Sequence, residues 1–344
     1  MVRPRYRLEI QRTPSGKFKY YLAKDVRVGR RKGKVKKYLG MKKPSNQVLG
    51  AARLEYAYDL ETRAIAKKAD LSINDYRPRH LDREQLRELE EMRFTEETLL
   101  KYMTKEEKRL FRINLEAHYI HGSLSIDGIE ADLGEVERLL RYNERGGMPY
   151  NVATIINNLR RMDDFRRKER GVFSVENVRR IHSLLFRGAG MESPGKFRRT
   201  DSEMIVGKEY RVSSYRDIES DLQKAIDGYY SGLKEEWHPF ELACLFHHSF
   251  LRIAPFTDGN GLVAREIMQQ MCIAERFPRS VINADQRTDY TNALRKADRG
   301  DMSGFMEGMK DIAVQARLEE MKKSLAELLS KGGNEPQRSL EDFS

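Results

Sequence analysis

The residues best suited to chemistry lie in one short turn, Asp258-Gly259-Asn260-Gly261, between two helical patterns. A helix that begins after this turn leaves backbone N–H groups free at its first turn, and its dipole makes that end attractive to an anion such as phosphate. The Asp258 carboxylate is a suitable ligand for a divalent cation that bridges phosphate oxygens. Arg265, about one turn into the helix, carries a planar guanidinium that matches the same anion. From its residues alone the turn predicts a plain connecting loop, with a phosphate site as the alternative.

Two amphipathic helices, expected over residues 239–253 and 262–275, position this turn. Pro255 ends the first helix, and the two glycines allow the positive φ that a tight turn into the second helix needs. Helical periodicity also covers most of the chain beyond residue 46, so the fold class is mainly α. We expect the other helices over 46–68, 82–102, 104–118, 133–142, 150–168, 175–187, 216–233, 287–297 and 302–330.

The first 45 residues predict strands instead. Residues 6–10, 18–28 and 35–40 keep mostly to a period of two, and turn-forming residues separate them at 13–16 and 29–34. This pattern favours a small three-stranded antiparallel meander. Three short strands are marginally stable alone, so we expect the meander to pack on a neighbouring element.

The net charge of +11 is concentrated in the same segment. Residues 1–50 hold sixteen Lys or Arg and only two acids, Glu9 and Asp25, whereas the remaining residues hold forty-eight bases and fifty-one acids. Tyrosine and phenylalanine residues are interleaved with these bases. Residues 1–45 therefore predict a solvated basic face or a protein-docking sheet, with a nucleic-acid partner as the alternative.

Several classes of protein are excluded by composition. The chain has no run of eighteen apolar residues, and no apolar stretch follows the charges at its beginning, so we expect no membrane partner and no signal peptide. Cys244 and Cys272 are too few for a disulfide framework and lie in no metal-ligand cluster. A cytoplasmic location is the corresponding expectation.

Near the end of the chain, apolar residues are spaced 4, 3, 4 and 3 apart, at Val314, Leu318, Met321, Leu325 and Leu328. This stripe is typical of an amphipathic helix. It predicts docking on the helix's own domain, with a partner helix or a homodimer seam as the alternative.

The segment from Ile253 to Arg265 resembles the signature of the Fic (Fido) family, His-Pro-Phe-x-(Asp/Glu)-Gly-Asn-Gly-Arg-x-x-Arg. The resemblance extends to the approach from His247 to Ile253, to Ile181-His182-Ser183-Leu184-Leu185 with Pro194-Gly195-Lys196-Phe197-Arg198, and to the segment 287–301, and so covers roughly 105–312. It implies a Fic-type helical bundle with a short β-hairpin flap.

That family transfers AMP from ATP to a serine, threonine or tyrosine hydroxyl of a target protein, a reaction known as AMPylation. The resemblance implies that ATP and Mg²⁺ are required and that Asp258 holds the metal. It implies a nucleotide site built from Gly259, Asn260, Gly261, Arg265 and Tyr290, the last on the adenine side. The flap would be a hairpin near 203–212 that carries Met204, Ile205 and Val206 and positions the target chain by strand pairing.

Two departures from the signature predict a poor or inactive transferase. Ala254 stands where the family has the histidine that takes the proton from the attacking hydroxyl, and a methyl group accepts no proton. Leu262 stands where the family has its first arginine, which removes a charged contact to phosphate. For His247, His248 and His182 we expect structural roles rather than a replacement base.

A regulatory element is predicted upstream. Ser123-Leu124-Ser125-Ile126-Asp127-Gly128 resembles the family's inhibitory helix, (Ser/Thr)-x-x-x-Glu-(Gly/Asn), whose glutamate pairs with the second arginine of the signature. Here the acid is Asp127, one methylene shorter, and its expected partner is Arg265. A helix cap with a turn at Asp127-Gly128 is the alternative.

Four regions follow from these patterns: a basic meander over 1–45, a helical linker with a possible regulatory role over 46–104, a Fic domain over 105–312, and an amphipathic helix with a tail over 313–344. The function expected is that of a catalytically impaired AMP transferase. The alternative is a non-catalytic nucleotide-sensing or binding module on the same scaffold.

Overall fold

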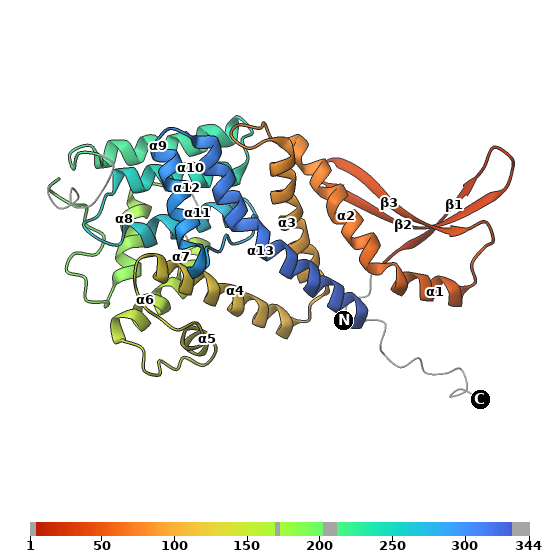
Figure 1. The fold of residues 1–344 in the computed structure, drawn as a ribbon, viewed down its shortest axis with the longest axis horizontal. Helices are drawn as coiled ribbons and strands as arrows, with labels where there is room; N and C mark the ends of the chain where they lie inside the picture. The colour runs from red at the N-terminus through yellow and green to blue at the C-terminus, as the bar shows by residue number, and fades with distance from the viewer. Residues whose placement is uncertain (1–4, 169–172, 202–211, 332–344) are drawn as a thin grey trace. The chain divides into compact units, whose positions relative to one another are not determined.

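The computed structural model describes residues 5–168, 173–201 and 212–331. The chain divides into two compact units: unit 1 comprises 1–76, 83–108 and 314–344, and unit 2 comprises 77–82 and 109–313. The elements of both are labelled in Figure 1. The expectation of a mainly α protein with a small amino-terminal antiparallel sheet is confirmed.

The sheet of unit 1 has the order β1-β2-β3, with β1 at Arg7–Arg12, β2 at Phe18–Val28 and β3 at Arg31–Gly40. Both pairs are antiparallel, with Leu8 opposite Leu22 and Leu22 opposite Lys37. Gly16 turns the first hairpin with a φ of 81°, a value that glycine adopts without steric cost. The predicted meander is confirmed.

One face of this sheet is covered by helix α2, Ala57–Ser72, which packs on β2 and β3 (Figure 1). Leu22 and Leu60 are fully buried between the two layers. At the same interface the buried Glu61 carboxylate accepts hydrogen bonds from the hydroxyls of Tyr6 at 2.9 Å and Tyr102 at 2.7 Å, and it pairs with Lys24. The expectation that the meander packs on a neighbour is confirmed.

The other helices of unit 1 differ slightly from the expected ranges. The helix predicted over 46–68 is two helices, α1 at Asn46–Glu55 and α2, because Tyr56 leaves the helical conformation with its N–H bonded to the Ala52 and Leu54 carbonyls. A 3₁₀ turn, η1, follows at Ile73–Asp75, and α3 runs over Arg83–Tyr102.

The long helix α13, Met302–Lys331, carries the predicted apolar stripe, and all five of its residues are buried. The second half of α13, from Val314 onward, belongs to unit 1. There Lys322 pairs with Glu91 of α3 at 3.2 Å, and Arg317 pairs with Glu96. Docking of the stripe within its own chain is therefore confirmed.

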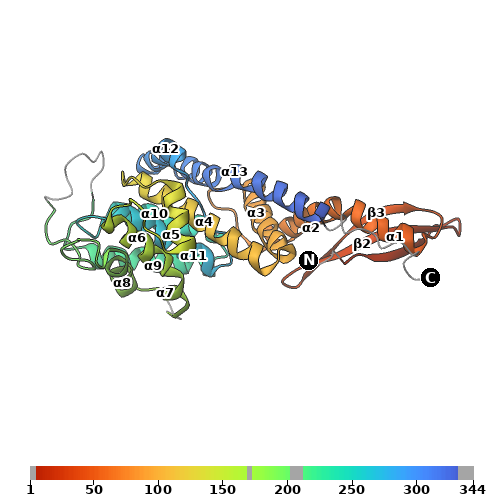
Figure 2. The ribbon, with the colours of Figure 1, turned by 90° about the horizontal axis from the view of Figure 1, so that it is seen from below.

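Unit 2 is built from helices (Figure 2). Its central helix is α11, Asn260–Ala274, in which every residue from Leu262 to Cys272 is buried, and α10, Pro239–Ile253, packs along it. The remaining elements are α4 (Lys105–Ile126, which begins in unit 1), α5 (Leu133–Tyr142), α6 (Tyr150–Arg160), α7 (Met162–Lys168), α8 (Val175–Phe186), α9 (Ile218–Lys234), η3 (Ala284–Gln286), α12 (Arg287–Asp298) and the first part of α13.

Three further outcomes concern unit 2 and the chain as a whole. The helix expected over 104–118 continues to Ile126, and the helix expected over 150–168 is divided into α6 and α7 at Arg161. The predicted flap residues Met204, Ile205 and Val206 lie outside the described residues. None of the described helices has the length and apolar character that crossing a bilayer requires.

Candidate functional site

The predicted phosphate turn joins α10 to α11. Ala254 ends α10 in the left-handed conformation with a φ of 46°, and its N–H donates to the Phe250 carbonyl at 2.8 Å. The Asn260 side chain closes the turn, because its amide donates to the Phe256 carbonyl at 2.6 Å and its oxygen accepts from the Phe256 N–H at 3.0 Å. The side chain of Asn260 is therefore committed to the turn itself.

Both glycines of the turn allow a close approach. A Cβ on Gly259, whose φ is 73°, would lie 2.4 Å from the Phe186 ring. A Cβ on Gly261 would lie 2.5 Å from the Asp127 carboxylate and 3.1 Å from the Arg265 guanidinium. The Asp127 carboxylate thus lies over the first turn of α11, where a bound anion would be expected.

Arg265 is held by the end of α4. Its guanidinium is 2% exposed and lies 2.9 Å from the Asp127 carboxylate, Nη2 to Oδ1. Nε donates to the Ser123 hydroxyl at 2.7 Å, and Nη2 donates to the Ser123 carbonyl at 2.8 Å. Burial alone would lower the pKa of Arg265, but the adjacent Asp127 and Tyr290 raise it above its ordinary value, so the group stays charged. The expected ion pair between Asp127 and Arg265 is confirmed.

The shorter aspartate reaches Arg265 because of its place in the chain. Helix α4 ends at Ile126, and the N–H of Asp127 bonds to the Leu124 carbonyl at 3.0 Å in the turn that follows. Asp127 therefore leaves the helix directly beside Gly261.

His182 joins two loops of the site. Its Nδ1 accepts from the Gly195 N–H at 2.8 Å, so the proton is on Nε2, which lies 3.2 Å from the Asp258 carbonyl. The ring stacks on Phe256 with centroids 3.7 Å apart. Burial lowers the pKa of His182 to about 4, so the ring is neutral near pH 7. The expected structural role of His182 is confirmed.

His247 and His248 also have structural partners. Nε2 of His247 lies 2.8 Å from the Tyr290 hydroxyl, and burial lowers the pKa of His247 to about 3. Nε2 of His248 lies 2.9 Å from the Asp298 carboxylate. Tyr290 itself is 3% exposed and packs against α10 through His247.

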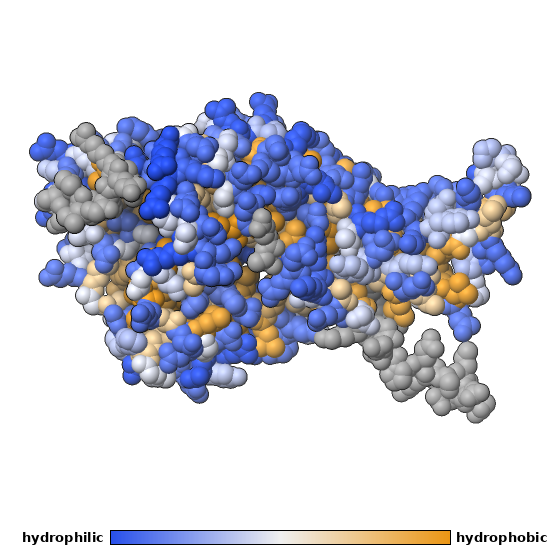
Figure 3. Space-filling model, in the orientation of Figure 1, coloured by the Kyte–Doolittle hydropathy of each residue, from blue (hydrophilic) through white to orange (hydrophobic). Residues whose placement is uncertain are grey.

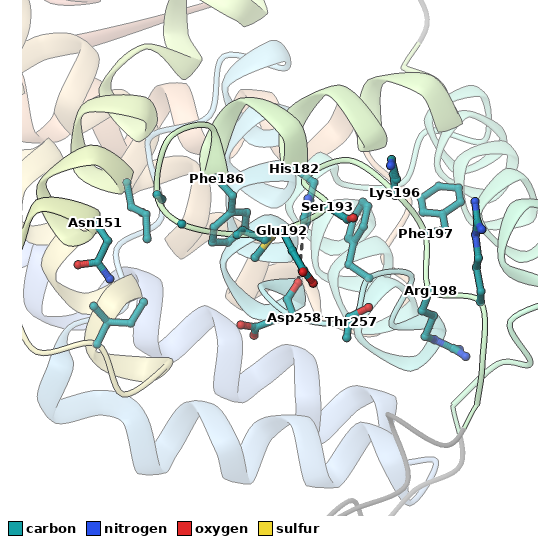
Figure 4. Close-up of a pocket in the computed structure, with 17 residues that line it drawn as sticks. Asn151, His182, Phe186, Glu192, Ser193, Lys196, Phe197, Arg198, Thr257 and Asp258 are labelled. Carbon is teal, nitrogen blue, oxygen red and sulfur yellow. Dashed lines mark hydrogen bonds between the residues drawn. The ribbon is translucent and has the colours of Figure 1, made fainter.

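A cavity of about 720 Å³ opens beside the turn (Figure 4). Asp258 and Thr257 form one wall, with the hydrogen bond from His182 to Asp258 behind them, and the loop that carries Lys196, Phe197 and Arg198 forms another. The Asp258 carboxylate accepts the N–H of Gly259 at 2.7 Å and lines the cavity, a position suited to holding a cation.

We expected Asp258, Asn260 and Arg265 to face one pocket, and of these three residues Asp258 lines this cavity. Asn260 and Arg265 do not line the cavity, because the Asn260 amide is bonded to Phe256 and the end of α4 covers Arg265. Gly261 and Tyr290 are likewise absent from its lining. The turn therefore contributes the Asp258 carboxylate to this cavity, while the Arg265 guanidinium is paired with Asp127.

Sequence reasoning assigned no role to several residues of this cavity, including Asn151, Glu192, Ser193 and Arg199. It also missed the function of Arg198, which is 3% exposed. Nε of Arg198 donates to the Ala254 carbonyl at 2.8 Å, and Nη1 pairs with Asp201 at 2.7 Å. The sequence Phe197-Arg198 after Gly195 could have pointed to this role, but the contacts of Arg198 with Ala254 join residues far apart in the chain.

The two departures from the signature are both buried. Ala254 is 0% exposed, and Leu262, in the first turn of the central helix, is 1% exposed. Within 5–168, 173–201 and 212–331, no group of three or more His, Cys, Asp or Glu could hold a metal ion. A single carboxylate fits Mg²⁺ only if phosphates and water supply its other ligands, which is how Mg²⁺ is commonly bound.

A mostly helical unit with a tight turn between two central helices defines the class of fold, and comparisons with known proteins agree. Residues 172–272 match the model of the Fic/DOC family. The likeness to the Fic/DOC family therefore includes the turn at residues 258–261 and the two helices that it joins.

Two relatives illustrate the extent of the likeness. Protein adenylyltransferase Fic of Nematostella vectensis is 29% identical over 133 residues, 39% of this chain and 30% of that protein. Protein adenylyltransferase fic-1 of Caenorhabditis elegans is 24% identical over 270 residues, 73% of this chain and 50% of that protein. The chain thus spans half or less of the length of these relatives.

Solved structures share the fold. A Fic domain-containing signaling protein from Bacteroides thetaiotaomicron superimposes with a TM-score of 0.58 at 17% identity, covering 70% of this chain and 98% of that one. Residues 134–508 of C. elegans Fic-1 superimpose with a TM-score of 0.55 at 19% identity, covering 83% and 86%.

Proposed function

We propose that unit 2 is a Fic-type nucleotide-binding scaffold that Asp127 holds closed, and that its AMP transferase activity is impaired as the chain stands. One observation carries the closed state: the Asp127 carboxylate lies over Gly261 and pairs with Arg265 at 2.9 Å. A carboxylate in this position competes with the terminal phosphate of a nucleotide for the same guanidinium and the same helix end.

The residues of the turn would contact different parts of a bound nucleotide. Asp258 would hold Mg²⁺, which neutralises phosphate charge when bound. The backbone N–H groups at Gly259, Asn260 and Gly261 would bind phosphate oxygens, and Arg265 would meet the terminal phosphate once Asp127 and Ser123 release it. Tyr290 would border the adenine side, and Met204, Ile205 and Val206 would position a target protein that carries a Ser, Thr or Tyr hydroxyl.

The chemical step is impaired because no base stands at the end of α10. General-base catalysis contributes about 10²–10⁴-fold to a rate, and the Ala254 methyl contributes none of it. His247 and His248 cannot replace the base without losing their side-chain contacts with the Tyr290 hydroxyl and the Asp298 carboxylate, respectively. Leu262 further weakens the grip on phosphate, because a charge-assisted hydrogen bond contributes about 1.5–3 kcal/mol.

Calorimetric titration with ATP, ADP and AMP, each with Mg²⁺, tests the closed state. Asp127→Asn removes the competing charge with little change in size, and Glu130→Gln is a matched control because Glu130 is an exposed acid three residues away. From the value of one charge-assisted bond, ATP should bind Asp127→Asn about 10- to 150-fold more tightly than the unmodified chain. AMP, which lacks the terminal phosphate, should bind both about equally.

Two results would contradict the proposal. If Glu130→Gln gave the same gain as Asp127→Asn, the effect would be one of general charge rather than release of Arg265. If no nucleotide bound Asp127→Asn at all, the turn would be a plain connection, and a protein-binding module without a nucleotide would replace the proposal.

A further inference from the structure

Unit 1 presents a sheet face that the nucleotide site does not use. Strand alternation and the pairing register divide the sheet into the face covered by α2 and an opposite face, here called the open face. Lys24 and Lys37 belong to the covered face, where they pair with Glu61 and Asp59. The open face carries Arg7, Glu9, Gln11, Lys19, Tyr21, Ala23, Asp25, Arg27, Lys32, Lys34, Lys36 and Tyr38.

Six of these side chains are basic and two are acidic, so the open face has a formal charge of +4. The acids lie among the bases: Glu9 pairs with Lys34 at 2.8 Å and with Lys36, and Asp25 pairs with Arg7 at 3.0 Å. Hydrogen bonds from Lys34 and Lys36 lower the pKa of Glu9 to about 2, so this carboxylate stays ionised and holds both ammonium groups in place. The bases are therefore ordered along the strand, and the face stays positive.

The arrangement of these charges favours a polyanion with regular spacing. Lys32, Lys34 and Lys36 follow one another at every second position of β3, an outer strand, and Arg7 lies on the other outer strand. Neighbouring strands lie about 4.7–4.9 Å apart, so the outer strands are about 10 Å apart. The major groove of B-form DNA is about 12 Å wide and lies between two continuous lines of phosphates.

The aromatic side chains of the same face favour a duplex over a single strand. The Tyr21 and Tyr38 rings contact each other with centroids 5.4 Å apart, and the Lys36 ammonium lies 5.6 Å from the centre of the Tyr21 ring. Single strands are bound by aromatic rings on which successive bases stack separately, and two rings in mutual contact do not supply such a series. Duplex RNA fits poorly, because its major groove is deep and narrow.

We propose that the open face of the β1-β2-β3 sheet binds the major groove of B-form DNA, with its lysine and arginine side chains on the phosphates. This binding depends only on unit 1, so it can hold or fail independently of the nucleotide site. Apolar residues also gather over the region of α1 (Figure 3). Val48 and Leu54 of α1 are exposed, and neither belongs to the open face.

Fluorescence anisotropy of the full chain with a labelled DNA duplex measures this binding. If about four phosphates are neutralised, the logarithm of the affinity should fall with the logarithm of salt with a slope of about −3.6. Raising salt from about 50 to about 200 mM should then weaken binding about 150-fold. No binding near 50 mM salt would overturn the proposal and leave a protein-docking sheet.

Lys34 and Lys37 provide a matched pair for the test. They lie on the same strand with side chains 35% and 36% exposed, but on opposite faces of the sheet. Lys34→Gln should weaken DNA binding and reduce the salt slope by about 0.9, whereas Lys37→Gln should leave the slope unchanged. Equal effects of the two substitutions would show that only net charge matters and would overturn the assignment to this face.

Competition experiments on the same chain test which type of nucleic acid the open face binds. Duplex DNA should compete at least about tenfold better than single-stranded DNA or duplex RNA of the same length. Equal or tighter binding of either competitor would overturn the choice of B-form DNA. In a triple variant, Lys32→Gln with Lys34→Gln and Lys36→Gln, the salt slope should be reduced about three times as much as in Lys34→Gln alone. Circular dichroism checks that this variant remains folded.

Discussion

Arg198 and Ala254 are joined by a hydrogen bond of 2.8 Å from the guanidinium Nε to the backbone carbonyl. The Arg198 N–H donates as well, to the Pro255 carbonyl at 3.0 Å. A side chain from the loop after α8 therefore fixes the end of α10, the position at which the Fic signature has its histidine.

Arg198→Met should destabilise unit 2 because it leaves buried carbonyls without a donor, each at a cost of about 1–3 kcal/mol. We expect a loss of about 2–4 kcal/mol, measured as a lower midpoint in urea. Arg199→Met is the control, since Arg199 is exposed and should change stability by less than about 0.5 kcal/mol. Equal losses in the two variants would mean that Arg198 does not hold the turn.

Ala254→His should give detectable but poor self-modification when the chain is incubated with radiolabelled ATP and Mg²⁺, and the unmodified chain should give none. Ala254 has a φ of 46°, and histidine is among the residues that adopt positive φ more readily than most. Ala254→Asn is the matched control, because asparagine tolerates the same backbone but is no base. Labelling of Ala254→Asn as strong as that of Ala254→His would mean that another residue is the base.

Adding Leu262→Arg to Ala254→His should increase the labelling further, because it restores a charged contact to phosphate. Leu262 is 1% exposed, so the new guanidinium should also lower the melting temperature when no nucleotide is present. ATP with Mg²⁺ should recover part of that loss. A melting temperature that does not respond to ATP would contradict the contact to phosphate.

Acid should destabilise unit 2 through His182 and His247. The pKa values of about 4 and about 3 lie below the ordinary value of 6.5, so the unfolded chain binds protons that the folded chain does not. The stabilisation is complete above about pH 6.5 and is lost as the pH falls towards 4, by up to about 1.4 kcal/mol per pH unit for each histidine. Urea midpoints between pH 7 and 5 should show this loss, and His182→Gln should have a shallower pH dependence. An unchanged slope in His182→Gln would show that other groups control the effect.

Glu61→Gln should destabilise unit 1 by about 3–5 kcal/mol, because the Lys24 ammonium is left without its charged partner. Thermal unfolding measures the loss. The double variant Glu61→Gln with Lys24→Met should recover part of it, since the unpaired charge is gone. Failure of the double variant to recover would show that the hydrogen bonds from Tyr6 and Tyr102 matter more than the ion pair.

The elements of the fold were largely predictable from local patterns. The meander follows from period-two alternation, and the two central helices from the apolar periodicity on either side of Asp258-Gly259-Asn260-Gly261. The break at Tyr56 was missed because no glycine or proline marks it. Local sequence also could not show that the side-chain amide of Asn260 would donate its hydrogen bond to the Phe256 carbonyl.

The tertiary part of the site was predicted only through the resemblance to a known family. The pairing of Asp127 with Arg265 joins residues far apart in the chain, and no local pattern contains it. The cavity beside Asp258 and the contacts of Arg198 depend in the same way on how loops meet in space, so they became visible only in the structure.

The burial of Leu262 ties phosphate binding at this position to the packing of unit 2. Leu262 lies in the first turn of α11 and is 1% exposed, so an arginine at position 262 would place its guanidinium in a packed interior rather than in solvent. An unpaired buried charge is costly, and a bound anion would reduce that cost. The affinity for nucleotide and the stability of the nucleotide-free chain should therefore change in opposite directions when residue 262 is replaced by arginine.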